Sequence, residues 1–321
     1  MSEAATLVIG KTGMVGSAWC ELLAARGEAF DATSRADLDI SDLGANDGIV
    51  GTHYKRVINC GAWTEVDGAE ADEAGATRIN GEAVAQLAAR CKATGATLVH
   101  YSTDYVFNGS ATSPYRVDEP RDPVNAYGRS KAVGEQAIER SGCDHLLVRT
   151  SWVYAPRGRN FVRTMAKLTR EKDSLKVVND QRGRPTSAAH LAAATDALLA
   201  NGARGTFHIC DGGECTWYEF TKQIAAHLGA TCDIQPCTSA EFPRPAKRPA
   251  YSVLDLTPTE EILGPMPHWQ QNLAAAPDHI AQTTTDPARR TFHQPLAQPC
   301  LDTFSSPAAA DSSARTSCAL S

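Results

Sequence analysis

A glycine-rich turn near the N-terminus narrows the choice of fold more than any other segment. Gly10, Gly13 and Gly16 have the spacing G-x-x-G-x-x-G, directly after the short apolar run 7–9 and before helical periodicity over 17–26. In a strand–turn–helix, the first glycine allows the tight turn, the second lets a diphosphate approach the backbone, and the third lets the helix pack close to the strand. The N–H groups at the start of the helix attract negative charge. The segment therefore predicts a dinucleotide-binding turn.

The first half of the chain alternates between apolar runs and helical periods. The expected elements are strands at 56–60, 97–101 and 145–149 and helices at 79–94 and 126–141. Continuous apolar strands separated by helices are typical of a parallel sheet that helices cover on both faces. The predicted fold class is α/β, with a Rossmann-type doubly wound parallel sheet.

Beyond residue 154 the pattern loosens, which indicates a smaller α+β domain. The expected elements are helices at 161–170, 187–200 and 217–228 and strands at 175–178 and 206–210. The predicted organisation is a dinucleotide-binding Rossmann domain at 1–154, to which 187–203 returns, and an interleaved substrate-binding domain at 155–275.

The end of the chain differs from the rest in composition. Residues 276–321 are rich in Ala, Ser, Thr and Pro and show no helical or strand period, and no helical period is found after residues 268–270 either. Such a composition buries too little apolar surface to offset the entropy of ordering. We expect a disordered, low-complexity tail over 276–321.

Composition excludes several classes of protein. The formal net charge of −6 argues against nucleic-acid binding, which needs a basic face. No apolar run approaches the roughly 20 residues that cross a bilayer, so we expect no membrane contact. No signal peptide is visible in the first residues, and neither the 10 cysteines nor the 9 histidines have the spacing of a metal site. We therefore expect reduced thiols, no metal and a cytoplasmic location.

The residues that follow the second predicted strand bear on the choice of cofactor. We place Asp31-Ala32-Thr33-Ser34-Arg35 after that strand, where Asp31 lies too early to bind a ribose. Ser34 and Arg35 can hold a 2′-phosphate, since a guanidinium suits bidentate phosphate contacts. The prediction is NADPH, with NADH as an open alternative and a plain surface arginine as the alternative interpretation of Arg35.

Tyr127 and Lys131 have the spacing Tyr-x-x-x-Lys and share one face of the predicted helix. A phenol is a poor acid at neutral pH, and a nearby ammonium lowers its pKa. Tyr127 can then protonate the alkoxide that forms when a hydride reaches a carbonyl carbon. Thr103 follows the strand 97–101, at the strand end where ligands bind, so its hydroxyl can polarise the same carbonyl. Thr103, Tyr127 and Lys131 are the predicted catalytic set.

Further blocks of sequence point to one family. They are NCGAWTEVD at 59–67, HYSTDYVF at 100–107, RTSWVYA at 149–155 and NDQRGRPT at 179–186. With the glycine turn and the Tyr127/Lys131 pair, the chain resembles the extended short-chain dehydrogenase/reductases and, within them, the dTDP-4-dehydrorhamnose reductases. The resemblance covers residues 5–275. It implies that NADPH reduces the C4 keto group of dTDP-4-dehydro-L-rhamnose to give dTDP-L-rhamnose, in dTDP-rhamnose biosynthesis.

The resemblance also implies roles for single residues. The implied cofactor-binding residues are Gly10, Thr12, Gly13, Met14, Val15, Gly16, Asp39, Ile40, Ala62, Trp63, Thr64 and Tyr101, together with Tyr127 and Lys131. The implied substrate-binding residues are Thr103, Asp104, Trp152, Lys247 and Arg248. Some family members dimerise through a magnesium site that includes a glutamate just after the NDQ block. Residues 187–190 hold no carboxylate here, so we expect a monomer or a weak homodimer.

Two other functions stay open. One is a reductase or epimerase that acts on another nucleotide sugar, because the identity of the sugar cannot be deduced from the residues. The other is a non-catalytic dinucleotide-binding protein that resembles the regulatory subunit of methionine adenosyltransferase. The intact set Thr103, Tyr127 and Lys131 argues against the second.

Overall fold

The computed structural model describes residues 5–42 and 53–275. Its central sheet has six parallel strands in the order β10-β5-β4-β3-β1-β2. The strands are β1 (Thr6–Ile9), β2 (Phe30–Thr33), β3 (Arg56–Asn59), β4 (Thr97–Thr103), β5 (His145–Thr150) and β10 (Gly205–His208). The strand order reverses next to β1, and ligands bind at the carboxyl ends of the strands where such a reversal occurs. The α/β fold class predicted from the sequence is confirmed.

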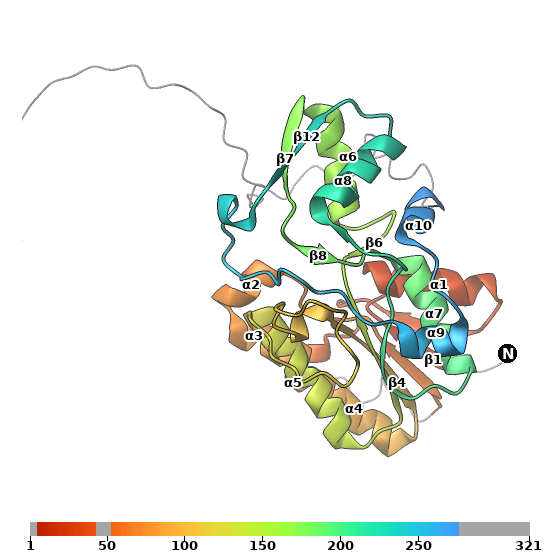
Figure 1. The fold of residues 1–321 in the computed structure, drawn as a ribbon. Helices are drawn as coiled ribbons and strands as arrows, with labels where there is room; N and C mark the ends of the chain where they lie inside the picture. The colour runs from red at the N-terminus through yellow and green to blue at the C-terminus, as the bar shows by residue number, and fades with distance from the viewer. Residues whose placement is uncertain (1–4, 43–52, 276–321) are drawn as a thin grey trace, which may run out of the picture. The chain divides into compact units, whose positions relative to one another are not determined.

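Helices cover both faces of this sheet (Figure 1). α1 (Met14–Ala25) and α7 (Ala188–Ala200) lie on one face, and α4 (Ala83–Thr94) and α5 (Ala126–Ser141) lie on the other. Side chains alternate along β1, so that Leu7 joins the apolar cluster of α4 and α5. Val8, the next residue, joins the cluster of α1 and α7. Every side chain of β1 and β4 is buried, which is why the apolar sequence of β1 is continuous.

The limits of α5 follow from its caps. The Asn125 side chain accepts a hydrogen bond from the Gly128 N–H, which starts the helix. Gly142 has φ 63°, a left-handed conformation that glycine adopts without strain, and it ends the helix. The range 126–141 predicted from the sequence is therefore confirmed.

The second half of the chain adds a smaller group of elements. They are β6 (Val153–Tyr154), α6 (Phe161–Glu171), β7 (Ser174–Val178), β8 (Arg182–Gly183), β9 (Thr186–Ser187), β11 (Cys215–Thr216), α8 (Trp217–His227), β12 (Asp233–Cys237), α9 (Thr257–Leu263) and α10 (Trp269–Ala275). β7 pairs with β12, and α6 and α8 lie beside this pair (Figure 1). The predicted division of the chain into two domains stays a proposal. α7 lies within the range 187–203, which was predicted to return to the sheet, and it packs against α1 there.

Several sequence predictions need correction. β2 ends at Thr33, so 31–33 belong to the strand rather than following it, and Ser34 is the first residue beyond. α1 begins at Met14, three residues before the predicted start at 17. The helix expected at 79–94 begins with a π-helical segment, Arg78–Glu82, and continues as α4. Two short helices, α2 (Val66–Ala71) and α3 (Glu73–Thr77), were not predicted.

A helix does follow residue 268, against the prediction. α10 is short, and its period is too brief to see in sequence, but Trp269 and Leu273 are buried in a cluster with Phe220. Tertiary packing therefore stabilises it. The prediction for 276–321 lies outside the described residues. Within 5–42 and 53–275, no helix is both long and apolar enough to span a bilayer.

Candidate functional site

The glycine turn leaves no room for a side chain at Gly16 and little at Gly10. Gly10 has φ 86°, and the N–H groups of Gly10 and Lys11 both donate to the carbonyl oxygen of Thr33, at 2.8 and 2.9 Å. A Cβ on Gly16 would lie 2.1 Å from the Gly10 carbonyl oxygen, so this position must be glycine. Gly13 is the N-cap of α1 and offers no side-chain cap to the helix N–H groups. An open helix N-terminus beside a closely packed glycine turn fits a diphosphate.

A cavity of about 200 Å³ opens next to this turn. Seven of its lining residues are predicted cofactor contacts: Gly10, Thr12, Gly13, Arg35, Asp39, Ile40 and Ala62. The lining residues that the sequence did not indicate are Ile9, Leu38, Cys60, Gly61 and Ile79. The predicted contacts outside the lining are Met14, Val15, Gly16, Ser34, Trp63, Thr64, Tyr101, Tyr127 and Lys131. The cavity thus joins the turn to the segments after β2 and β3.

The segment after β2 contains an acidic group that the sequence argument overlooked. The backbone N–H and the hydroxyl of Ser34 both donate to Asp37 Oδ2, each at 2.8 Å. Lys11 Nζ lies 3.0 Å from the same carboxylate oxygen. These contacts, the Ser34 N–H first, lower the pKa of Asp37 to about 2. Ser34, a predicted phosphate contact, therefore already binds a carboxylate, whereas Arg35 lies 3.4 Å from Asp39 with an exposed side chain.

Thr103, Asp104 and Tyr127 come together at the carboxyl end of β4. Thr103 Oγ1 donates to Asp104 Oδ1 at 2.9 Å and accepts from the Tyr105 N–H at 3.2 Å. A hydrogen bond also joins the side chains of Thr103 and Tyr127. Burial raises the pKa of Asp104 to about 6, although hydrogen bonds from Ser252 and Thr103 oppose the shift. Two of the three predicted catalytic residues are thus in direct contact.

The expected effect of Lys131 on Tyr127 is wrong for this structure. Burial raises the pKa of Tyr127, and the negative charge of Asp104 raises it further, against the effect of its hydrogen bond with Thr103. The Lys131 amine lies instead 2.6 Å from the Tyr101 carbonyl oxygen and 3.2 Å from His100 Nε2. The amine is therefore directed toward β4, which explains why it does not lower the pKa of the phenol.

Tyr101 faces the other side of the sheet. Its hydroxyl accepts from Trp19 Nε1 at 2.6 Å and donates to Thr195 Oγ1 at 3.1 Å, within the core under α1 and α7. Tyr101 contacts Lys131 through its backbone carbonyl oxygen and not through its side chain.

The segment after β3 is held against α5 by a residue that the sequence argument missed. Asn80 Oδ1 accepts from the Trp63 N–H at 2.9 Å, and Asn80 Nδ2 donates to the Trp63 carbonyl and to Ser130 Oγ. Trp63 and Tyr127 pack against the same small cluster of alanines. Asn80 lies in the π-helical segment, and such segments are frequent at functional sites, but they leave no signal in hydrophobic periodicity.

Trp152 belongs to an aromatic stack at the predicted substrate end. Its backbone has φ 47°, and its ring stacks on Trp217 with centroids 3.5 Å apart and planes 11° apart. Gly183 makes room for this ring, because a Cβ there would lie 2.6 Å from the indole. The sequence indicated Trp152 and the block containing Gly183, but not their contact.

The two predicted basic substrate contacts, Lys247 and Arg248, lie in different surroundings. Arg248 Nη2 lies 3.0 Å from Asp67 Oδ1, and Arg244 also binds the Asp67 carboxylate, so a segment of the second half of the chain is tied to α2. Burial would raise the pKa of Asp67, but the two arginines outweigh it and lower the pKa. The side chain of Lys247 is exposed, and its carbonyl accepts from Asn125.

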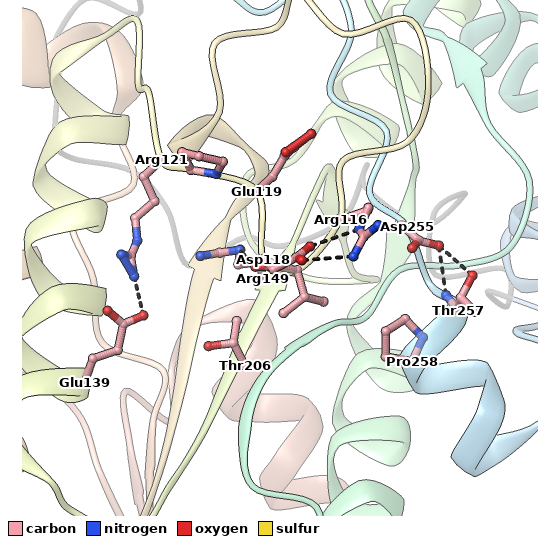
Figure 2. A pocket seen from close by; sticks show the side chains of 12 residues that line it. Arg116, Asp118, Glu119, Arg121, Glu139, Arg149, Thr206, Asp255, Thr257 and Pro258 are labelled. Atoms are coloured by element: carbon pink, nitrogen blue, oxygen red, sulfur yellow. Dashed lines mark hydrogen bonds and ion pairs between the residues drawn. The ribbon is translucent and has the colours of Figure 1, made fainter.

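A larger cavity, of about 620 Å³, lies elsewhere and contains none of the predicted site residues (Figure 2). Four of its charged side chains form two pairs, Arg116 with Asp118 and Arg121 with Glu139. The Arg149 guanidinium binds Glu135, which does not line the cavity. Charges of both signs line the cavity, so we do not assign the chemistry to it.

Comparison with known proteins identifies the family of the chain. The family model described as RmlD substrate binding domain matches residues 4–282. The chain belongs to this family. A dTDP-4-dehydrorhamnose reductase of Burkholderia thailandensis is 40% identical over 283 residues, which cover 82% of this chain and 95% of that protein. A dTDP-4-keto-6-deoxy-D-glucose reductase of Streptomyces niveus is 39% identical over 274 residues, covering 84% and 95%.

A solved reductase structure has a similar fold. The dTDP-4-dehydrorhamnose reductase of Bacillus anthracis, in complex with NADP, has a TM-score of 0.82 and 33% identity. The match covers 86% of this chain and 99% of that one. The family resemblance predicted from the sequence is therefore confirmed.

Proposed function

We propose that this protein reduces the C4 keto group of dTDP-4-dehydro-L-rhamnose with NADPH and forms dTDP-L-rhamnose. The observation that carries the proposal is the contact of Thr103, Asp104 and Tyr127 at the end of β4, within a chain of the RmlD family. Relatives matched over nearly their whole length are named as reductases of this substrate. Cytoplasmic location and a monomeric or weakly dimeric state remain predictions.

The residues present fit the cofactor. The glycine turn, with Gly16 closely packed and the N-terminus of α1 open, would hold the diphosphate, and Asp39 and Ile40 line the cavity where the adenosine would bind. When bound, the nicotinamide supplies the hydride. Lys131 would hold the ribose next to it. Trp63, fixed by Asn80, would limit the space around the ring.

The proposed proton donor is Tyr127. Because its pKa is raised, it is a neutral phenol at pH 7 and carries the proton that an alkoxide at C4 requires. Thr103 would polarise the same oxygen and orient the phenol through their hydrogen bond. Trp152 would cover one face of the sugar, since an indole offers both an apolar face and an N–H donor.

A second candidate is reduction of another dTDP-4-keto sugar. It is favoured by one observation: the Streptomyces niveus relative is as similar as the first one but is named a dTDP-4-keto-6-deoxy-D-glucose reductase. Both candidates use the same Thr103/Tyr127 chemistry and differ only in the sugar.

The test is NADPH oxidation at 340 nm (the nicotinamide absorbance) on addition of dTDP-4-dehydro-L-rhamnose. Tyr127→Phe should lower kcat by about 10² to 10⁴, the usual contribution of a general acid. Tyr218→Phe, which removes a phenol from α8, is the matched control and should retain the rate. Equal, negligible rates for wild type and Tyr127→Phe would refute the enzyme function. Faster turnover of another 4-keto sugar would refute only the substrate.

A further inference from the structure

Buried side chains of β3, β4 and α5 are joined by a chain of hydrogen bonds. Asn59 Nδ2 lies 3.0 Å from His100 Nδ1, and His100 Nε2 lies 3.2 Å from Lys131 Nζ. The three side chains are 1%, 1% and 2% exposed, so water cannot relieve a mismatch among them. Each proton in this chain must therefore have an acceptor.

The orientation of the Asn59 amide decides where the imidazole proton is. Asn59 Oδ1 accepts the backbone N–H of Gly61 at 3.0 Å, which leaves the amide NH₂ to face His100. An NH₂ group only donates, so His100 Nδ1 must accept, and a neutral imidazole then carries its proton on Nε2. That N–H points at the Lys131 amine.

An ammonium is a poor partner for this N–H. A protonated Lys131 has donors only and would place an N–H against an N–H, whereas a neutral amine accepts from His100 and still donates to the Tyr101 carbonyl. The other arrangement, with the imidazole proton on Nδ1, moves the same clash to Asn59 unless its amide turns and abandons Gly61. The contacts thus favour the neutral amine.

The charged groups near Lys131 in the described part of the chain offset only part of this effect. Glu135 lies one turn beyond Lys131 on α5, and its carboxylate is bound by Arg149 and Arg121. Asp104 is bound by Thr103, and Tyr127, one turn before Lys131, is an uncharged phenol. Burial of the amine lowers the pKa of Lys131 to about 8, against the charge of Glu135. Burial, together with the charge of Lys131, lowers the pKa of His100 well below its usual value.

We propose that Asn59 and His100 are positioning residues that present an imidazole N–H to Lys131, favour its neutral amine, and so set the upper pH limit at which this amine binds a cofactor hydroxyl as an ammonium. The role of Lys131 toward the cofactor rests on the proposed function; the state of the Asn59–His100 pair does not.

The first test reads the pair directly. The ¹⁵N NMR spectrum of wild-type protein with labelled histidine, assigned with His100→Gln, should show His100 at about pH 9.5, where the Lys131 amine is mostly neutral, as the Nε2–H tautomer with a lone pair on Nδ1. A His100 signal of the Nδ1–H tautomer, or of an imidazolium, would overturn the proposal. This measurement needs neither cofactor nor sugar.

The second test follows NADPH binding by fluorescence from pH 6 to 10. Affinity should fall about fivefold as Lys131 loses the ammonium's charge-assisted hydrogen bond, with a midpoint near pH 8 in the wild type. His100→Gln can offer the ammonium a carbonyl oxygen, and Asn59→Asp can take the Nδ1 proton and free Nε2 to accept. Both variants should therefore move the midpoint up by about one pH unit or more, a tenfold change in the protonation equilibrium.

His227→Gln removes an exposed histidine on α8 and is the matched control, with an unchanged midpoint. If both variants bind NADPH with the wild-type midpoint, the pair has no influence on Lys131 and the proposal fails. If the wild type does not bind NADPH at any pH, the proposed function fails, and the NMR measurement alone decides about the pair.

Discussion

Two regions of the site differ in the atoms that they present to a ligand. The glycine turn between β1 and α1 presents backbone atoms, and its shape is fixed by the absence of side chains at Gly10 and Gly16. The region between β4 and α5 presents buried side chains, and what they can do depends on where each proton lies. The function of the first region depends on close packing of the backbone, which the spacing of glycines in the sequence reveals. The function of the second depends on contacts between side chains from separate elements, which only the fold brings together.

The largest effect should come from filling the space at the turn. In Gly16→Ala the new Cβ would lie 2.1 Å from a backbone oxygen that no side chain can move aside. We expect a loss of at least about 3 kcal/mol in the free energy of unfolding, at the upper end of overpacking costs, measured by urea denaturation. NADPH binding should be lost as well, because the turn must shift.

Gly27→Ala is the matched control at the other end of α1. Gly27 has φ 67° but nothing lies within 4 Å of its added Cβ, so only the backbone conformation is penalised. That cost is roughly 1–2 kcal/mol, and NADPH binding should be retained. Equal losses for the two variants would show that close packing does not shape the turn.

A smaller effect, dependent on pH, should come from Asp104 in the side-chain region. Its pKa is raised from the usual 3.8 to about 6, so the folded protein binds its proton more tightly than the unfolded chain does. The folded state is therefore penalised above pH 6, by about 3 kcal/mol, and the penalty disappears as the pH falls toward 4. Asp104→Asn should be more stable than wild type at pH 8 by up to this amount and equal to it near pH 4.

Urea denaturation at the two pH values measures this difference, and Asp118→Asn, which removes an exposed carboxylate paired with Arg116, serves as the control. A constant difference between Asp104→Asn and wild type at pH 4 and 8 would mean that the carboxyl is not held out of water. The stability of the region between β4 and α5 would then depend on packing, as that of the glycine turn does, and not on the charge of Asp104.

The fold was largely predictable from the sequence, because strands buried on both faces and helices with clear caps carry their own signal. The limits of α5 were predicted correctly since Asn125 and Gly142 mark its ends. α10 was missed, as it depends on Phe220 far away in the chain. The end of β2 was misplaced because Asp31 is polar, although its side chain binds Tyr54 from within the strand.

The site was predictable in its parts but not in its connections. Spacing indicated Thr103, Tyr127 and Lys131, and the structure joins the first two. The spacing in the sequence did not indicate that Lys131 would face His100, which lies 31 residues earlier, or that Asn80 would hold Trp63. Those contacts depend on side chains from separate elements, and pKa shifts depend on burial, which no local pattern shows.

The smallest effect should come from Asp37, an acidic side chain next to the glycine turn. Asp37 occupies the donors of Ser34, and because its pKa is held at about 2 it is ionised at every pH used for assay. An anion there repels the 2′-phosphate of NADPH but not the 2′-hydroxyl of NADH. Asp37→Asn should raise the ratio of kcat/KM for NADPH over NADH by about threefold, a modest change because the site is exposed and screened.

The ratio is measured with both cofactors at constant ionic strength, and Asp118→Asn, which removes the same charge far from the turn, should leave it unchanged. Added salt should shrink the difference between Asp37→Asn and wild type, since screening weakens repulsion between exposed charges. A ratio that falls in Asp37→Asn would mean that the carboxylate instead helps to order Ser34 for the phosphate. Cofactor choice would then depend on the shape of this segment, as diphosphate binding depends on the shape of the glycine turn.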